Sequence, residues 1–373
     1  MRRRAFLQLA AAIPGRAGAQ SSVPAYKIVT PFKSSAGDRA SGMPGPYPGK
    51  IIRVRSEKCI DSRSARVDVP TVRQMISRGM RSLTGAGADR DAWARFFDSR
   101  DVVGIKVNCS GAPDIMSTPE VVAEIVANLR ALDIPAKNIY IYERFLDQLT
   151  SVHYERYVPE GVQIVAIETP RGSIAHYDPA AYVEVNFFGE DDTRSNLARL
   201  VTDRLTKIIN VPNLKDHRAS GVTGCLKNIS YGNFSNVARS HNRADTHTRT
   251  FIGTLAAVEP LRSKTVLQVM DGMSGVWHGG PFAPDPRFRF FPKQMMFATD
   301  PVAIDRIELD LIEAKRKAEG ALSLYDRSMS NIGDFNTPRM NQFIREPGHI
   351  EYAAELGLGV YELERIHIGE LVI

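Results

Sequence analysis

The segment KIINVPNLKDH, residues 207–217, decides the fold that we expect for the whole chain. Its first five residues, Lys207–Val211, form a short run that is nearly continuous in apolar residues. Such runs are typical of strands that are covered on both faces, as in parallel sheets. Lys215 and His217 follow where the strand would end, and neither is a turn-forming residue. The segment therefore predicts a buried parallel strand with a polar site near its carboxyl end.

Further apolar runs of the same kind recur on both sides of this segment. They predict strands at residues 51–55, 102–107, 139–142, 162–167, 265–270, 295–298 and 365–368. Helical patterns lie between them: Ser117-Thr118-Pro119-Glu120 opens one at 121–132, with a capping hydroxyl and a proline in the first turn. Asp300-Pro301 opens another at 302–319. This alternation predicts an α/β fold, a mostly parallel sheet with helices on both faces, as a single large domain with embellishments over residues 51–373.

Polar residues fall at the ends of several of these predicted strands. Lys106 and Asn108 stand at the end of one strand, Asp271 ends another, and Asp300 follows a third. Since the carboxyl ends of parallel strands share one edge, we expect these residues to line one cleft with Lys215 and His217. Asn and Asp are also common capping and turn residues. That alternative is strongest for Asp300, which stands where a helix N-cap belongs.

The segment SGVTGCLKN, residues 220–228, has two glycines, the hydroxyl of Thr223 and the amine of Lys227 at the start of a helix. Exposed backbone N–H groups there could hold an anion, and a plain tight turn is the alternative. The GxxxxGK[ST], GxGxxG and GxSxG patterns are absent, so neither a nucleotide-binding loop nor a serine-hydrolase elbow is indicated.

These motifs together resemble the family known as domain of unknown function 362. The resemblance rests most specifically on Asn210-x-Pro-x-Leu-Lys-x-His217, Gly221-Val-Thr-Gly224 and Lys227-Asn228, and also on Lys106 with Asn108, Asp271-Gly272, Asp300-Pro-Val-Ala-Ile-Asp305 and Gly357-Leu-Gly359. It covers most of the chain from about residue 51. The resemblance implies no settled activity. Many relatives carry a ferredoxin-like module with clustered cysteines, which this sequence lacks.

The three cysteines, Cys59, Cys109 and Cys225, stand far apart and form no CxxC pair. They therefore argue against an iron–sulfur cluster and a zinc ribbon. Three buried thiols, or one disulfide with one free thiol, are expected instead.

A divalent metal stays open as a cofactor, with His217, Asp271 and His278 as candidate ligands. His241, Asp245 and His247 also lie close together in sequence. Their spacing is not a recognised ligand pattern, and the arginines around them suit an anionic ligand as well.

The N-terminus, MRRRAFLQ, resembles the twin-arginine (Tat) export consensus. A short apolar stretch follows at residues 7–13, and Ala17-Gly18-Ala19 matches a small-x-small cleavage site. We therefore expect a signal peptide at residues 1–19, an extended arm at 20–50, recognition by the Tat export machinery, and a periplasmic or otherwise extracytoplasmic mature protein.

Removing that signal changes the charge balance. The four arginines among residues 1–19 reduce the 48 basic residues to 44, against 42 acidic ones, so the net charge falls from +6 to +2. This balance gives no support for nucleic-acid binding. No later stretch is apolar and long enough to be a transmembrane segment of the mature chain.

Three functions remain open from the sequence. The first is an exported enzyme that acts on a small anionic substrate. Its candidate catalytic residues are His217, Lys215 and Asp271, and its candidate ligand-binding residues are Lys106, Asn108, Thr223, Lys227, Asn228 and Asp300. The second is a non-catalytic ligand- or cofactor-binding protein of the periplasm. The third is an iron–sulfur or metal-dependent redox protein, which the cysteines disfavour.

Overall fold

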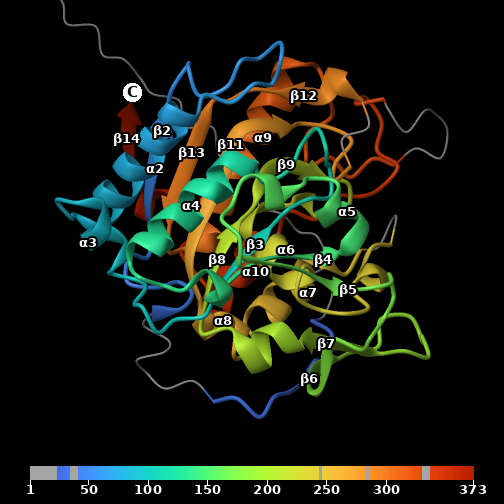
Figure 1. The fold of residues 1–373 in the computed structure, drawn as a ribbon. Helices are drawn as coiled ribbons and strands as arrows, with labels where there is room; N and C mark the ends of the chain where they lie inside the picture. The colour runs from blue at the N-terminus through green and yellow to red at the C-terminus, as the bar shows by residue number, and fades with distance from the viewer. Residues whose placement is uncertain (1–22, 34–40, 243–245, 283–284, 330–336) are drawn as a thin grey trace, which may run out of the picture.

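An eleven-stranded mixed sheet forms the centre of the molecule (Figure 1). Its main path has the order β14-β2-β13-β11-β8-β3-β4-β5. These strands are β2 (Lys50–Arg55), β3 (Val103–Val107), β4 (Ile139–Phe145), β5 (Gln163–Glu168), β8 (Lys207–Val211), β11 (Thr265–Val276), β13 (Gln294–Ala298) and β14 (His367–Val372). Each of the eight predicted strands overlaps one of them. Three shorter strands, β9 (Asn213–His217), β10 (Gly221–Val222) and β12 (Arg289–Phe290), complete the sheet.

The computed structural model describes residues 23–33, 41–242, 246–282, 285–329 and 337–373. The predicted signal peptide, part of the predicted arm and Asp245 lie outside these ranges. Within them, none of the helices has the length and apolar character needed to cross a membrane.

Strand direction decides which residues can meet at one edge of the sheet. β11, β8, β3, β4 and β5 are parallel, and β14 is parallel to β2. β13 is antiparallel to both of its neighbours, β11 and β2. The prediction of a mostly parallel sheet is therefore confirmed. The carboxyl end of β13, however, lies at the edge opposite to the carboxyl ends of the other strands of the main path.

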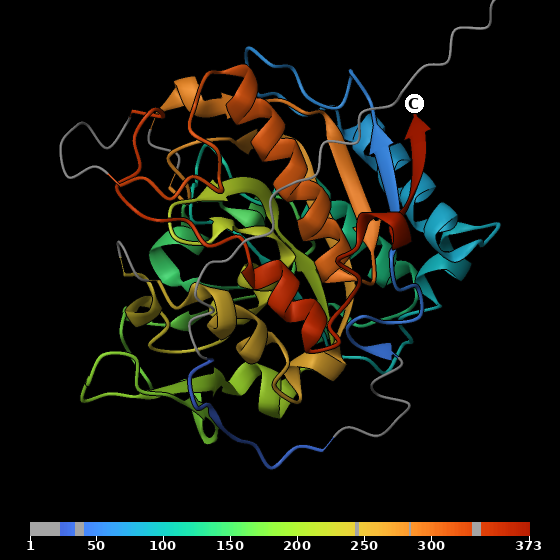
Figure 2. The same ribbon diagram turned by 180° about the vertical axis from the view of Figure 1, so that it is seen from behind.

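Helices cover both faces of the sheet, as predicted (Figures 1 and 2). One face packs against α2 (Val69–Thr84), α3 (Asp89–Trp93) and α4 (Pro119–Ala131). The other packs against α6 (Gly224–Tyr231), α7 (Thr248–Ala256), α9 (Pro301–Ala318) and α10 (His349–Glu355). Two further helices are short: α5 (Leu146–Thr150) follows β4, and α8 (Leu261–Lys264) precedes β11. Burial on both faces explains why the strands are almost continuously apolar.

The two predicted helix starts differ in how their first turns are held. Asp300 caps α9, where its carboxylate accepts from the N–H of Ala303 at 2.9 Å. Thr118 occupies the N-cap of α4, but its hydroxyl makes no capping bond. Instead the N–H of Thr118 donates to the carboxylate of Asp271 at 2.8 Å. The predicted position of α4 is confirmed, and the prediction that a hydroxyl caps its first turn is wrong.

A separate three-stranded antiparallel sheet lies beside the main one and was not predicted. Its order is β1-β6-β7, with β1 (Lys27–Val29), β6 (Tyr177–Glu184) and β7 (Arg194–Ala198). β1 comes from the segment expected to be an extended arm, and it pairs with β6 through Lys27–Val29. Part of that arm is therefore a strand of the folded domain.

Candidate functional site

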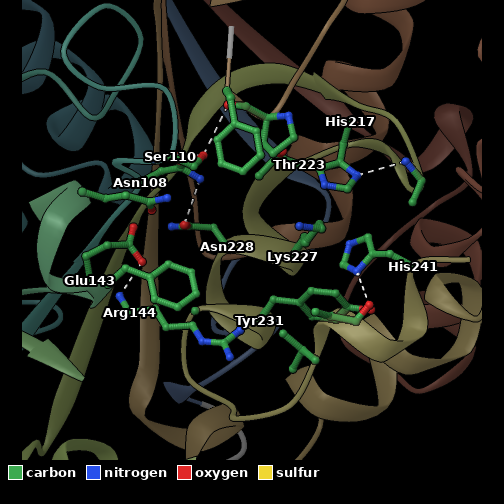
Figure 3. A pocket seen from close by; sticks show the side chains of 18 of the residues that line it. Asn108, Ser110, Glu143, Arg144, His217, Thr223, Lys227, Asn228, Tyr231 and His241 are labelled. Atoms are coloured by element: carbon green, nitrogen blue, oxygen red, sulfur yellow. Dashed lines mark hydrogen bonds between the residues drawn. The ribbon is translucent and has the colours of Figure 1, made fainter. Parts of the chain in front are cut away.

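A cavity of about 450 Å³ opens beyond the carboxyl ends of β3, β4 and β9 (Figure 3). Its polar wall comes from these strand ends, from α5, from the segment after β5, from α6 and from the segment before α7. The polar lining consists of Lys106, Asn108, Ser110, Glu143, Arg144, Gln148, Arg171, His217, Arg218, Thr223, Lys227, Asn228, Tyr231 and His241. Its apolar lining includes Phe145, Val237, Pro281, Phe282 and Phe343. The structure thus brings together six of the predicted site residues: Lys106, Asn108, His217, Thr223, Lys227 and Asn228.

Lys106 is held by an ion pair at the base of this cavity. Its ammonium donates to Glu143 Oε1 at 2.8 Å, to the carbonyl of Val107 at 2.6 Å and to Asn228 Oδ1 at 3.3 Å. Oε2 of Glu143 accepts from the N–H of Cys109 at 3.1 Å. With all three ammonium protons directed at protein oxygens, the charge of Lys106 is compensated within the fold.

Lys215 lies behind the cavity wall and does not line it. Its ammonium donates to Asn108 Oδ1 at 2.8 Å, to Ser110 Oγ at 3.2 Å and to the carbonyl of Pro281 at 3.4 Å. Burial lowers the pKa of Lys215 to about 8. Lys215 therefore orients two cavity residues and adds positive charge behind them.

Lys227 differs from both of these lysines. Its ammonium forms no hydrogen bond or ion pair with the residues that the structure describes, and it stands 4.8 Å from the ring centroid of Tyr231. In Figure 3 its side chain lies between Asn228 and the two histidines. Burial, then the charges of Lys215 and Arg144, lower the pKa of Lys227 to about 7. An unpaired cation in such a place destabilises the free protein.

The Nε2 atoms of the two cavity histidines have opposite hydrogen-bonding roles. Nδ1 of His217 accepts from the N–H of Ala219 at 3.1 Å and of Ser220 at 3.3 Å, so the proton of the neutral ring is on Nε2. Nδ1 of His241 contacts the carbonyl of Ala238 at 3.2 Å, so it carries the proton and Nε2 is an acceptor.

Both histidines are neutral at physiological pH. Burial, with the charge of Lys227 next, lowers the pKa of His217 well below its usual value and that of His241 to about 3. The ring centroids are 5.2 Å apart. One neutral ring can therefore donate a hydrogen bond where the other can accept one.

The predicted anion cradle at the start of α6 is already occupied by the protein itself. The N–H groups of Cys225 and Leu226 donate to the two carboxylate oxygens of Asp305 at 2.5 and 2.9 Å. A Cβ on Gly224, which has a φ of +57°, would stand 2.4 Å from that carboxylate. The glycine is thus required by the approach of Asp305, and the expectation that these amides hold an external anion is wrong. The hydroxyl of Thr223 is buried on the cavity wall without a hydrogen-bond partner among the described residues.

The expectation that Asp271 and Asp300 would line the same cleft is also wrong. Asp271 lies in the middle of β11, and its bond to Thr118 places it on the face covered by α4, opposite to α6. Asp300 follows β13, whose antiparallel direction takes its carboxyl end to the other edge of the sheet. The carboxylate of Asp300 accepts from the N–H groups of Gly49, Ala303 and Val360.

The candidate metal ligands do not form a cluster. His278 lies outside the cavity, where Nδ1 is 3.1 Å from a guanidinium nitrogen of Arg316. His247 stacks on Phe187 with ring centroids 4.4 Å apart. Across the described ranges, no group of three His, Cys, Asp or Glu side chains is arranged to hold a metal ion. Cys59, Cys109 and Cys225 are three buried free thiols, the first of the two arrangements expected.

Sequence reasoning missed Glu143, Arg144 and Tyr231. Glu143 and Arg144 come directly after the predicted strand 139–142, so the rule that found Lys106 also applies to them. Tyr231 is one helical turn after Lys227, on the same face of α6. His241 was considered only as a metal ligand.

The fold and the cavity define an α/β protein with a cationic site at the carboxyl edge of a mostly parallel sheet. The family model described as domain of unknown function (DUF362) matches residues 103–310, which include all the cavity-lining strands and α6. The chain belongs to this family. No curated protein matches the sequence.

Proposed function

We propose that the cavity binds a small anionic organic molecule and that the protein catalyses proton transfer on it. The observation that carries this proposal is the ammonium of Lys227, which faces the cavity without a partner among the described residues. A cation in this position is costly unless an anion compensates it.

The other charges around the cavity support an anion rather than a cation. Three basic residues on the wall already have carboxylate partners: Lys106 pairs with Glu143, Arg144 with Glu168 and Arg171 with Asp147. Among the described residues that line the cavity, Glu143 is the only carboxylate, and its oxygens accept from Lys106 and Cys109. A cationic ligand would therefore meet no available negative charge from these residues, whereas an anion would meet Lys227.

Lys227, whose pKa of about 7 lies near physiological pH, can exchange a proton with the bound molecule. The neutral histidines orient that molecule, because the Nε2–H of His217 can donate a hydrogen bond to it and Nε2 of His241 can accept one. The hydroxyl of Thr223 adds a donor on the same wall. Lys215 acts indirectly in this proposal, by positioning Asn108 and Ser110. The phenylalanines of the wall suit the apolar part of an organic ligand.

Sulfate and a panel of small carboxylates test the binding step by calorimetry. We expect the wild type to bind at least one of them, and Lys227→Met to weaken that binding more than tenfold. Lys137→Met, at an exposed lysine elsewhere, is the matched control and should bind like the wild type. Equal binding by the wild type and Lys227→Met would remove the main support for the proposal.

We also propose that the protein acts outside the cytoplasm after twin-arginine export, on the strength of the MRRRAFLQ segment and the Ala17-Gly18-Ala19 site. Replacing Arg3 and Arg4 by lysine should leave unprocessed precursor in the cytoplasm, because the export receptor reads the arginine pair. Cell fractionation with an antibody to the chain measures this. Normal processing of the double variant would contradict export by this route.

A further inference from the structure

We propose that Lys227 is a nucleophilic amine that forms an imine with a carbonyl group of the bound molecule. This inference rests on the proposed function and narrows the ligand class to molecules that carry both an anionic group and an aldehyde or ketone. No other lysine combines its position and its lack of partners within the described residues that line the cavity.

The comparison with Lys106 shows why Lys227 is the reactive one. Both side chains reach the same cavity, 121 positions apart in sequence. The ammonium of Lys106 is fixed by Glu143 at 2.8 Å, and a carboxylate at that distance keeps an amine protonated. No carboxylate of the described residues contacts Lys227, because Glu143 is already bonded to Lys106 and Cys109. Of the two lysines, Lys227 is therefore the one that can present its nitrogen lone pair.

The charges around Lys227 favour the neutral amine. With a pKa of about 7, about half of the Lys227 amines are unprotonated at pH 7, against about one in three thousand for a lysine at its ordinary pKa. Lysines that react with carbonyl groups are activated in this way, by burial or by a second cation. Lys215, held behind Asn108, supplies that second cation.

The atoms of the proposed step balance without an oxidant or reductant. The lone pair of Lys227 Nζ attacks the carbonyl carbon, a C–N bond forms, and one proton passes from Nζ to the carbonyl oxygen to give a neutral carbinolamine. The second Nζ proton then passes to the hydroxyl, the C–O bond breaks, and the oxygen leaves as water when a C=N bond forms. The Nε2–H of His217 can donate a hydrogen bond to the oxygen and Nε2 of His241 can accept one from Nζ–H, so the two neutral rings align the atoms that exchange the protons.

The test traps the imine in the full-length protein. Glyoxylate, which carries a carboxylate and an aldehyde, is added at pH 7 with sodium cyanoborohydride, and the modified lysines are identified by peptide mass spectrometry. We expect reductive modification of Lys227 more than tenfold faster than of the exposed Lys137. Sulfate should slow the reaction at Lys227 and leave Lys137 unaffected. Modification spread evenly over surface lysines, with none favoured at Lys227, would overturn the inference.

Two further arms separate this inference from the proposed function. Lys227→Arg keeps a positive charge but forms no imine, so it should still bind sulfate and lose the adduct. If the wild type binds sulfate but is not modified at Lys227, the imine inference is wrong and anion binding stands. Glycolaldehyde has an aldehyde and no negative charge. If it labels Lys227 as fast as glyoxylate does, and sulfate does not bind, the amine is reactive but the anion site does not exist.

Discussion

Neighbouring residues of helix α6 treat charge in opposite ways. The N–H groups of Cys225 and Leu226 donate to the carboxylate of Asp305, whose charge is thereby compensated within the protein. The ammonium of Lys227, the next residue of the helix, has no such partner among the described residues. At the far edge of the sheet, Asp300 resembles Asp305, because its carboxylate accepts from three backbone N–H groups. These residues belong to the motifs on which the resemblance to the family rests.

The difference separates structural motif residues from ligand-facing ones. A buried polar group with its hydrogen bonds complete stabilises the fold, whereas an uncompensated one costs free energy in the unliganded protein. A Cβ on Gly359 would stand 1.9 Å from Asp300 Oδ1, so the closing Gly357-Leu-Gly359 motif belongs to the first group. Lys227 and Thr223 belong to the second. Four experiments test this division.

The largest effect is expected from removing the carboxylate that caps α6. Asp305→Ala leaves two buried helix N–H groups without acceptors and opens space beside Gly224. We expect the free energy of unfolding to fall by about 3 kcal/mol. Urea denaturation followed by circular dichroism measures it.

Asp310→Ala is the matched control, since Asp310 is exposed on α9, the helix that also carries Asp305, and its carboxylate pairs with Arg306. Its loss should change the free energy of unfolding by no more than about 0.5 kcal/mol. A similarly small change for Asp305→Ala would show that its bonds to α6 do not hold the helix in place.

Lys227→Met should raise the free energy of unfolding, in contrast to Asp305→Ala. The pKa of Lys227 falls from 10.5 in the unfolded chain to about 7 in the folded protein, so the unfolded state binds more protons between these values. The penalty is largest below pH 7 and disappears as the pH rises toward 10.5. At pH 7 we expect Lys227→Met to unfold with about 1–3 kcal/mol more free energy than the wild type.

That gain should shrink when the same denaturation is repeated at pH 9.5. Lys137→Met should change stability little at either pH, because Lys137 is exposed. A destabilised Lys227→Met variant would mean that Lys227 is a structural residue like Lys106.

The sequence predicted the sheet well because burial on both faces leaves a direct signal. Every strand of the main path overlaps a predicted apolar run, including the antiparallel β13. An apolar run does not reveal the direction of its strand, because a parallel and an antiparallel strand that are buried on both faces have the same apolar pattern. Asp300 was therefore assigned to the wrong edge. Asp271 was misplaced for a related reason: β11 continues to Val276, so the residue taken as a strand end is in its middle.

The cavity was predictable where a residue lies at or just beyond the carboxyl end of a strand, as Lys106, Asn108 and His217 do. What the sequence could not give was the assignment of partners. Contacts between segments about 37 to 122 residues apart decide these pairings. They determine whether Glu143 pairs with Lys106 or Lys227, and whether the α6 amides face a ligand or Asp305. Local spacing carries no record of these contacts.

The affinity for an anion should depend on pH through Lys227. Because the anion binds the protonated amine, affinity for sulfate should be highest below pH 7 and fall as the pH rises from 7 to 8, approaching tenfold per pH unit. The pKa values of His217 and His241 are lowered, so both rings stay neutral over this range. Calorimetry with sulfate at pH 6, 7 and 8 measures the slope. The arginine of Lys227→Arg stays charged from pH 6 to 8, so the sulfate affinity of this variant should change little over that range. If the sulfate affinity of the wild type is equally insensitive to pH, the anion binds elsewhere.

The smallest effect is expected at Thr223, and it separates binding from stability most cleanly. The hydroxyl is buried on the cavity wall with no partner in the described part of the chain, so Thr223→Val removes no bond within the protein. Stability should stay the same or rise by up to about 1 kcal/mol.

If the hydroxyl donates to the bound anion, the same substitution should weaken sulfate binding about threefold to tenfold, which corresponds to roughly 1 kcal/mol. Thr254 offers the contrast, because its buried hydroxyl donates to the carbonyl of Thr250 at 2.8 Å. Thr254→Val should cost about 1 kcal/mol of stability and leave binding unchanged. Thermal unfolding and sulfate titration of both variants decide the matter: Thr223→Val should lose affinity without stability, and Thr254→Val should lose stability without affinity. Unchanged sulfate affinity in Thr223→Val would place the anion away from this hydroxyl and leave Lys227 as the residue that holds it.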